Sequence, residues 1–455
     1  MIVFKRKIYK EFLNWKKESK GSDSLLIEGA RRIGKSTIVE EFAKKEYKSY
    51  ILLDFNDCSE QVKDAFNTKL INLDDFFSIL SYTYNINLYP RKTLIIFDEV
   101  QQFPKARQSI KKLVKDGRFD YIETGSLISI NENVKDITIP SEEKSIKMFP
   151  LDFEEFAWAM EKNNICDYIR ECFKKQIPLE PSIHKEAMFL FKQYMLIGGM
   201  PQSILDYIEH SFSFEYCDRR KRMINDLYRK DIQKIKFIYR KKVEAVFNQI
   251  PSYLSKHEKR IVFSKVAGGI NTEDSYENTF LWLSDSMIAN CCYKCNDPSV
   301  GLSMNIDDSA IKCYMADTGL LFSLAFDENK IADEQLYKQI MNDKLSINKG
   351  MLYENIIAQM LSANCHKLFF YTHFNKEKHR NDLEIDFLLS ESSSVDSKII
   401  PIEVKSSKNY TKSSLDDFIV KYKDKIKSAY IIHPKNLLKK ENGIIAIPPY
   451  MTICL

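Results

Sequence analysis

The chain has 455 residues, which is too many for one hydrophobic core and predicts two to four domains. Hydrophobic residues make up 44% of the chain and aromatic residues 12%, so folded domains are expected and general disorder is excluded. The net charge of +5 is close to neutral, so it does not by itself indicate a nucleic-acid binder, and any basic surface must be local.

The ten cysteines show no repeated spacing, which favours reduced and mostly buried thiols. Cys292 and Cys295 form a single C-x-x-C pair, without the second pair or nearby histidines that a zinc site would need. The first residues lack the apolar core of a signal peptide, and no apolar run is long enough to cross a bilayer. We therefore expect a cytoplasmic protein without a membrane partner.

Strands and helices alternate in the first third of the chain. After an expected helix at 7–17, short apolar strands are predicted at 25–27, 50–55, 93–97 and 121–124. Helical stretches connect these strands, which is typical of a parallel sheet covered on both faces.

The pattern changes beyond about Pro150. It is mostly helical from Leu151 to Tyr228, with a break at Gly198 and Gly199. After about Ile311, strands are predicted in the segments IKCYMA, KLFFYTHF, EIDFLLS, IIPIEVK and SAYIIHP.

The first strand leads into a loop that matches G-x-x-x-x-G-K-[ST] and is followed by a helix. Such a loop wraps its backbone around phosphate oxygens, and its amide groups point at their negative charge. Lys35 is expected to reach the β- and γ-phosphates of ATP, and the Ser36 hydroxyl to bind Mg²⁺. The residues expected to contact the nucleotide are Gly29, Ala30, Arg31, Arg32, Ile33, Gly34, Lys35, Ser36 and Thr37.

A second acidic motif completes this predicted site. The apolar run 94–97 is expected to deliver Asp98 to the carboxyl edge of the sheet, where it would hold Mg²⁺ through water. Glu99 would orient the attacking water and remove its proton. Thr124 or Ser126, at the end of a further strand, would touch the γ-phosphate or the water; an ordinary strand-end turn is the alternative.

Six segments in this order carry a specific resemblance: GARRIGKST, LIIFDEVQQFP, ETGSLIS, MFPLDFEEF, LIGGMPQSI and YRKDI. Over about 30–231, the chain resembles the AAA-type ATPases of bacteria and archaea that carry a C-terminal domain of unknown function. The resemblance implies that Lys35, Ser36, Asp98 and Glu99 belong to the nucleotide site, with Thr124 or Ser126 as the sensor.

One departure from this family concerns a transition-state arginine. Many relatives have a Gly-Arg pair before the strand that leads into the MFPLDFEEF-like segment, whereas this chain has Lys144 in that stretch. A lysine could replace the arginine only as a point charge. We therefore expect a nucleotide-dependent switch that needs a protein partner or a homo-oligomer for full turnover; a plain monomeric ATPase is the alternative.

Residues 243–296 resemble a winged helix-turn-helix, with helices expected at 246–257 and 263–270. A third helix would start at about 275 and run into a wing strand. The start of this third helix is acidic, which argues against base reading, so a protein contact is an equal alternative. The arginines and lysines between 219 and 242 could contact phosphates, or could form a solvated helix face.

The last strands carry a second candidate site. Glu403 and Lys405 point to one face of their strand, and Asp386 on a neighbouring strand can join them. With Glu354 as a further carboxylate, these residues would bind Mg²⁺ and cut a phosphodiester. The set resembles the PD-(D/E)XK nuclease fold, which the same ATPase family is noted for carrying.

Three functions remain open for this last domain: an active nuclease, a nuclease-derived binding module, or a protein-interaction domain. Lysines near the site favour nucleic acid over protein as the partner of this domain, and DNA is the nucleic acid that we expect. The nearby basic residues are Lys376, Lys378, Arg380, Lys405, Lys408 and Lys412.

The predicted organisation is therefore α/β throughout. An AAA-type ATP-binding domain is expected at 1–155, a helical lid at 156–235, a winged-helix-like domain at 236–300 and a nuclease-like domain at 301–455. The predicted activity is Mg²⁺-dependent ATP hydrolysis coupled to the nuclease-like domain.

Overall fold

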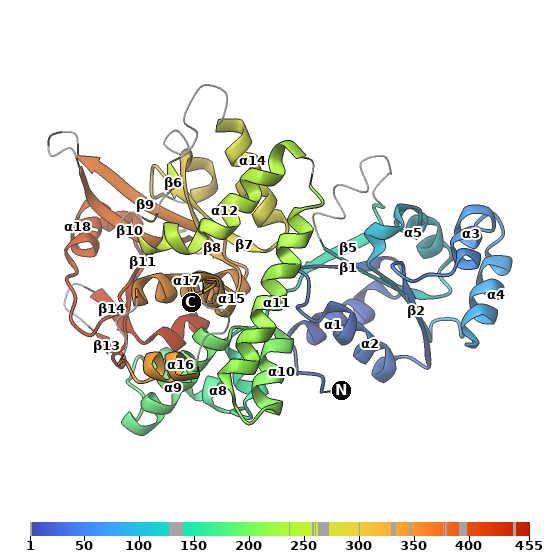
Figure 1. Cartoon of the computed structure of the whole chain (residues 1–455), viewed down its shortest axis with the longest axis horizontal. Helices are drawn as coiled ribbons and strands as arrows, with labels where there is room; N and C mark the ends of the chain where they lie inside the picture. The colour runs from blue at the N-terminus through green and yellow to red at the C-terminus, as the bar shows by residue number, and fades with distance from the viewer. Residues whose placement is uncertain are drawn as a thin grey trace. The chain divides into compact units, whose positions relative to one another are not determined.

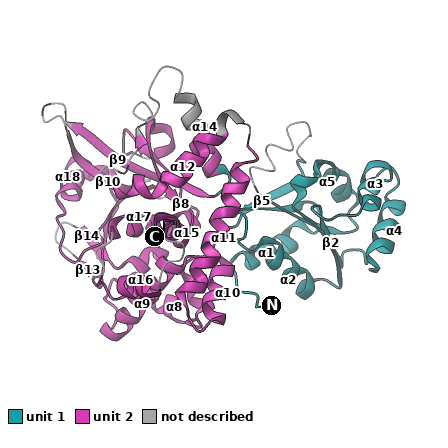
Figure 2. Ribbon diagram, viewed as in Figure 1, with its two compact units in different colours: residues 1–149, 285–287 teal, residues 150–284, 288–455 magenta. Residues whose placement is uncertain are grey.

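The computed structural model describes residues 2–126, 140–235, 237–256, 259, 261–262, 273–299, 301–328, 334–344, 348–375, 377, 380–390, 398–439 and 443–455. The chain forms two compact units, which Figure 2 colours separately. The first unit contains residues 1–149 and 285–287, and the second contains residues 150–284 and 288–455. Each unit has its own sheet and its own hydrophobic core.

Five parallel strands form the sheet of the first unit, in the order β2-β3-β4-β1-β5 (Figure 1). They are β1 (Ser24–Glu28), β2 (Ser49–Asp54), β3 (Thr93–Asp98), β4 (Asp120–Gly125) and β5 (Glu143–Lys147). Because β3, β4 and β1 are neighbours and parallel, their carboxyl ends meet at one edge of the sheet, where ligands bind in open α/β sheets.

Helices cover both faces of this sheet. Alternate residues of the central strands, such as Ile95 and Phe97, pack into a core with α3 (Glu60–Thr68), α4 (Leu73–Tyr84) and α5 (Pro104–Asp116). On the other face lie α1 (Ile8–Ser19) and α2 (Lys35–Glu46), where Phe12 and Phe42 pack edge to face at 5.3 Å. The predicted parallel α/β sheet is confirmed.

The second unit begins with helices. They are α7 (Phe153–Ala159), α8 (Ile165–Lys175), α9 (Pro181–Ile197), α10 (Pro201–Glu209), α11 (Phe214–Ile232) and α12 (Phe237–Ser255). The mostly helical stretch and its break at Gly198 and Gly199, between α9 and α10, are confirmed.

Nine strands form the mixed sheet of the second unit, in the order β13-β14-β12-β11-β10-β9-β7-β8-β6. They are β6 (Ile261–Val262), β7 (Ala289–Cys295), β8 (Ile306–Met315), β9 (Leu368–Asn375), β10 (Arg380–Ser390), β11 (Ile399–Val404), β12 (Ala429–Ile432), β13 (Leu438–Lys439) and β14 (Ile444–Ile447). Leu415 and Phe418 of α18 (Ser413–Lys421) pack on one face with Ile385, and α17 (Lys349–Ala363) lies against the other.

The winged-helix arrangement is not confirmed. Its predicted second helix, 263–270, lies outside the described residues. The expected third helix is α14 (Glu273–Asp285), and the strand expected as a wing is β7, which pairs with both β8 and β9 inside the nine-stranded sheet. The predicted boundary at residue 300 therefore falls between strands of one sheet, and the division into four domains stays a prediction.

Three segments that are distant in the sequence meet within the second unit. The Leu151 amide donates to Gly199 O at 2.7 Å, and the Gly199 amide donates to the Asp317 carboxylate at 2.5 Å. A Cβ atom on Gly199 would lie 2.1 Å from Leu151 O, so only glycine fits there. Asp317 also caps α15 (Thr318–Ala325) by accepting from the Leu320 amide at 2.9 Å. The MFPLDFEEF and LIGGMPQSI segments are therefore joined by direct backbone contact.

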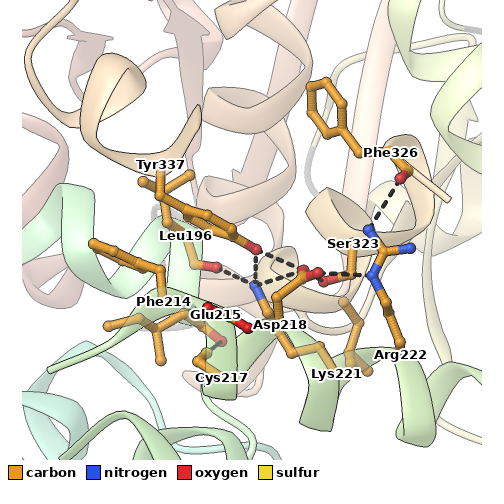
Figure 3. Close-up of polar contacts among 12 residues, drawn as sticks. Leu196, Phe214, Glu215, Cys217, Asp218, Lys221, Arg222, Ser323, Phe326 and Tyr337 are labelled. Atoms are coloured by element: carbon orange, nitrogen blue, oxygen red, sulfur yellow. Dashed lines mark hydrogen bonds and ion pairs between the residues drawn. The ribbon is translucent and has the colours of Figure 1, made fainter. Parts of the chain in front are cut away.

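Most of the basic side chains on α11 form ion pairs or hydrogen bonds within the second unit. Lys221 is completely buried and donates to Leu196 O at 2.7 Å and to the Tyr337 hydroxyl at 2.8 Å (Figure 3). Arg222 donates to Asp218 at 2.7 Å. Tyr337 lies on α16 (Glu334–Met341), so this network ties α11 to α16.

All ten cysteines are free, and eight of them are buried. The prediction that most of the thiols are buried is thus confirmed. Within the described part of the chain, no three His, Cys, Asp or Glu side chains are grouped so that they could hold a metal ion.

Candidate functional site

The glycine-rich loop joins the carboxyl end of β1 to the start of α2. Arg32 and Gly34 adopt left-handed backbone conformations, with φ values of 66° and 91°. At Gly29, a Cβ atom would lie 2.5 Å from Met148 O, so the backbone approach excludes any side chain. Ala30 and Ile33 are buried beneath the loop, whereas Arg32 and Thr37 are exposed. The loop backbone therefore faces outward, free to approach phosphate oxygens.

Lys35 folds back into this loop. Its Nζ donates to Gly29 O and Ala30 O, both at 2.9 Å, and the side chain is buried. Burial lowers the pKa of Lys35 to about 8, against the opposing charges of Glu99 and Asp98. The ammonium group is thus held at the position where the motif would present it to phosphates.

Asp98, at the end of β3, accepts hydrogen bonds from two hydroxyl groups. The Ser36 hydroxyl donates to Asp98 Oδ1 at 2.7 Å, and the Thr124 hydroxyl donates to the same oxygen. Burial raises the pKa of Asp98, and these two hydrogen bonds oppose that shift. The side-chain oxygens of Ser36 and Asp98 are hard donors of the kind that Mg²⁺ prefers, so the residues present fit this ion. Ser126 lies just beyond β4 and is partly exposed.

Glu99 follows Asp98 in a left-handed conformation, with φ of 52°. Its backbone amide donates to the Thr124 hydroxyl at 3.4 Å, and the Gln101 side-chain amide donates to its carboxylate. Gln101 is buried, and the sequence interpretation had missed it, although it belongs to the same DEVQQFP segment. The structure therefore brings Lys35, Ser36, Asp98, Glu99 and Thr124 to one edge of the sheet.

Lys144, at the position considered for a transition-state charge, lies on β5 and is half exposed. Its Nζ is 3.6 Å from the Glu18 carboxylate, an exposed group on α1. An ion pair between exposed side chains contributes little to stability, so this contact leaves Lys144 able to move.

The second candidate site lies on the sheet of the second unit. Glu354 of α17 is buried and accepts hydrogen bonds from Lys259 and, at 3.2 Å, from the Tyr314 hydroxyl. Burial raises the pKa of Glu354; the nearby charge of Asp386 acts in the same direction, and Lys259 opposes it. Both oxygens of this carboxylate are thus already engaged by side chains.

Asp386 and Glu403 lie on neighbouring strands. The Val404 amide donates to Asp386 Oδ2 at 2.8 Å, and Lys405 Nζ donates to Glu403 Oε1 at 2.5 Å. Glu403 Oε2 is buried and forms no hydrogen bond with any described residue. Burial raises the pKa of Glu403 to about 6, with Lys405 opposing the shift. This unsatisfied oxygen, beside a second carboxylate, fits a divalent cation or a bound water.

A buried lysine that the sequence interpretation did not single out completes this group. Lys312 on β8 is completely buried, and its Nζ lies 3.0 Å from Glu384 and 3.6 Å from Asp386. Burial acts to lower the pKa of Lys312, but the charges of Glu384, Asp386 and Glu354 outweigh it and raise the pKa above its usual value. The carboxylates of the second site are therefore compensated by an internal cation.

Three family models match separate parts of the chain. Residues 22–157 match a model described as an AAA domain, residues 188–330 match a domain of unknown function (DUF8612), and residues 349–451 match another (DUF4143). The chain therefore contains an AAA-type P-loop domain. The predicted nuclease-like character of the last domain is shown by none of these matches.

An uncharacterised protein of Methanocaldococcus jannaschii is 22% identical over 298 residues, which are 62% of this chain and 57% of the relative. The chain thus matches less than two thirds of that relative's length. Among solved structures, a Walker-type ATPase of Pyrococcus abyssi has 15% identity and a TM-score of 0.36, covering 71% of this chain and 96% of that one. Cdc6p of Pyrobaculum aerophilum has 11% identity and a TM-score of 0.25, covering 74% and 93%. These scores are too low to support an argument about function.

No helix in the described part of the chain combines the length and the apolar composition needed to cross a bilayer.

Proposed function

We propose that the first unit binds ATP and hydrolyses it with Mg²⁺. The observation that carries this proposal is the convergence of Ser36 and Thr124 on one oxygen of Asp98, beside the loop that encloses Lys35. The AAA-domain match over residues 22–157 supports the same activity.

Each residue then has a distinct task. Lys35 exchanges its two loop carbonyls for phosphate oxygens, and Ser36 and Asp98 hold Mg²⁺, which supplies positive charge to the phosphates. Glu99 accepts the proton of the attacking water, and Gln101 keeps its carboxylate oriented through their hydrogen bond. Thr124 contacts both Asp98 and the Glu99 amide, so a movement of either residue would be transmitted to β4, the strand that carries Thr124.

Two substitutions test this function. Lys35→Ala removes charge-assisted bonds to phosphate, so ATP should bind about 10- to 100-fold more weakly. Glu99→Gln should bind ATP like the parent but hydrolyse it about 10²- to 10⁴-fold more slowly, because the base is lost. Lys44→Ala, on the exposed side of the same helix α2, is the matched control. Parental hydrolysis by both site variants would exclude the proposal.

We further propose that turnover depends on a protein partner or a second copy of the chain. The support is the absence of an arginine in the stretch 141–147, where Lys144 offers only a point charge. An arginine supplied in trans raises phosphoryl-transfer rates by about 10³- to 10⁵-fold. Specific activity should therefore rise with protein concentration; a flat specific activity would favour the monomeric ATPase.

A second function is proposed for the sheet of the second unit: divalent-cation binding through Asp386 and Glu403, acting on or near DNA. The unsatisfied Glu403 Oε2 supports it. Glu354 remains a predicted further ligand, although Lys259 and Tyr314 already engage its two oxygens. Lys405, bonded to Glu403, would stabilise charge on a phosphodiester.

Plasmid nicking with Mg²⁺ or Mn²⁺, with and without ATP, separates the three possibilities. An active nuclease should lose cleavage in Asp386→Ala and Lys405→Ala. Salt-sensitive binding without cleavage would leave a nuclease-derived binding module. If neither binding nor cleavage occurs, the domain serves protein interaction.

A further inference from the structure

A large cleft opens beside the second candidate site. Its volume is about 1410 Å³, which exceeds the roughly 300–1,000 Å³ of most small-molecule pockets and favours a polymeric ligand. One wall is a face of α9, and the other comprises residues 341–344, residues 348–350 at the start of α17 and the loop that follows β11. All of these elements belong to the second unit, and α9, α16 and α17 pack together in it.

The lining of the cleft is basic. Five lysines face it and only two carboxylates, Glu186 and Asp343. Glu186 is paired with Lys162 at 2.7 Å, and Asp343 with Lys192 and Lys349, both at 2.7 Å. The other three lining lysines form no ion pair with a described residue: Lys185, Lys344 and Lys408. The cleft therefore carries uncompensated positive charge, which suits a polyanion.

An exposed aromatic ring lies among these lysines. Phe189 lines the cleft and is 55% exposed, so its ring is accessible to a ligand in the cleft. Lys185 and Lys192 are four residues before it and three residues after it on α9, so the ring and both ammonium groups share one helix face. Aromatic side chains between cations are typical of surfaces on which unpaired bases stack.

The cleft leads toward the carboxylates of the second site. Its lining residues Gly350 and Tyr353 precede Glu354 on α17, and Ser406 directly follows Lys405. A Cβ atom at Gly350 would lie 3.8 Å from Lys259 Nζ and 4.0 Å from Ser406 Oγ, so the start of α17 and the loop after β11 approach each other where Lys259 binds Glu354. A ligand in the cleft would therefore end beside the site.

We propose that this cleft binds single-stranded nucleic acid, with the phosphates contacting Lys185, Lys344 and Lys408 and a base stacking on Phe189. The inference rests on the function proposed for the second site and names its substrate as an unpaired strand. A duplex hides its base faces in the stack, so the ring of Phe189 favours a single strand over a duplex. An acidic peptide would use the lysines but would gain nothing specific from stacking.

Binding can be measured on the full chain by fluorescence anisotropy, with labelled single-stranded DNA, single-stranded RNA and duplex DNA of one sequence. EDTA is present, so that cleavage does not interfere. Lys408→Gln should bind the strand more weakly and reduce the slope of log K against log salt by about 0.7, because one phosphate contact is lost. Phe189→Ala should weaken binding by about 5- to 100-fold with little change in that slope.

Matched controls isolate the cleft. Lys174→Gln replaces an exposed lysine of α8 outside the cleft, and Tyr82→Ala removes an 82% exposed ring from the first unit. Both should bind like the parent. Equal binding by DNA and RNA strands would place recognition on phosphate and base; a preference for one would add a sugar contact to the same proposal.

Three outcomes overturn the proposal: no strand binding by the parent, tighter binding of the duplex than of the strand, or strand binding that Lys408→Gln and Phe189→Ala leave unchanged. Calorimetric titration of Mn²⁺ into the same proteins keeps the cleft and the second site separate. Loss of strand binding with intact Mn²⁺ binding assigns the defect to the cleft. Parental strand binding in Asp386→Ala, with Mn²⁺ binding lost, assigns the defect to the carboxylates.

Discussion

Lys221 and Lys312 are both completely buried in the second unit, but their partners differ. Lys221 donates hydrogen bonds to a backbone carbonyl and to the Tyr337 hydroxyl, with the Asp218 carboxylate 3.9 Å away. Lys312 lies close to two carboxylates but forms no hydrogen bond with any residue that the structure describes.

The acids beside the two lysines differ as well. Asp218 is completely buried and accepts from Ser323 at 2.6 Å and from Tyr337 at 2.7 Å. In contrast, the side chains of Glu384 and Asp386 beside Lys312 are 34% and 15% exposed. A buried charged group whose hydrogen bonds are all made stabilises one packing arrangement. A group with unmade hydrogen bonds can still bind a ligand. The comparison therefore favours a structural role for Lys221 and, for Lys312, a role beside the proposed cation site.

The largest expected effect is on the structural lysine. Lys221→Met removes the buried cation beside Asp218 and its hydrogen bonds to Leu196 O and the Tyr337 hydroxyl. Although Arg222 stays paired with Asp218, the free energy of unfolding should fall by about 3–5 kcal/mol. Urea unfolding followed by circular dichroism measures this loss. Lys230→Met, an exposed position on the same helix, should change stability by less than about 0.5 kcal/mol. Similar small effects for both would contradict the structural role.

Lys312→Met should have a smaller effect on stability, about 1–3 kcal/mol, because water can reach Glu384 and Asp386. Its stronger effect should be on ion binding. Removing a positive charge from beside Asp386 should tighten Mn²⁺ binding by about tenfold or more, which corresponds to about 1.4 kcal/mol of repulsion removed. Isothermal titration calorimetry measures this affinity. An unchanged affinity would show that the cation does not bind near Lys312.

Lowering the pH should reduce the difference in unfolding free energy between the parent and Asp218→Asn. Burial opposes ionisation of Asp218, but Lys221 and then its hydrogen bonds outweigh burial and lower its pKa. The resulting stabilisation is complete above the unfolded-state pKa of about 3.9 and is lost as the pH falls through the lower folded-state pKa. The unfolding free energies of the two proteins, measured at several pH values, should thus differ by a constant amount above about pH 5. They should converge below about pH 4. A gap that widens in acid would contradict the assignment.

The smallest expected effect concerns one partner of Asp218. Ser323→Ala removes one hydrogen bond and leaves the others in place, so the unfolding free energy should fall by about 1 kcal/mol. Thermal unfolding measures this change. Ser252→Ala, which removes the hydroxyl of an exposed residue on α12, is its control and should be neutral. A loss as large as that of Lys221→Met would mean that the network acts as one unit.

Local motifs made the proposed nucleotide site predictable from the sequence. The glycine loop with Lys35 and Ser36 lies within eight residues, and Asp98 with Glu99 follows one apolar strand, so each half can be identified alone. The parallel sheet then follows from the alternation of strands and helices. Gln101 was overlooked because its role depends on the left-handed turn at Glu99, which the sequence does not reveal.

The second unit was less predictable because its contacts are distant in sequence. Lys312 meets Asp386 only because β8 and β10 belong to one sheet, separated by β7 and β9. No short motif records that arrangement. The strand β7 was expected as a wing, because its sequence is compatible both with a wing and with a strand inside a larger sheet. Only its pairing with β9 places it inside the sheet.

The position of β7 has a consequence for biosynthesis. This strand ends at Cys295, but its parallel neighbour β9 begins only at Leu368. At about 5–20 residues per second, the ribosome needs roughly 4–15 s to make the intervening chain. During that interval β7 can pair with β8, but its other edge stays open as a template for other chains. The nascent protein is therefore most exposed to aggregation after β8 has been made and before β9 emerges.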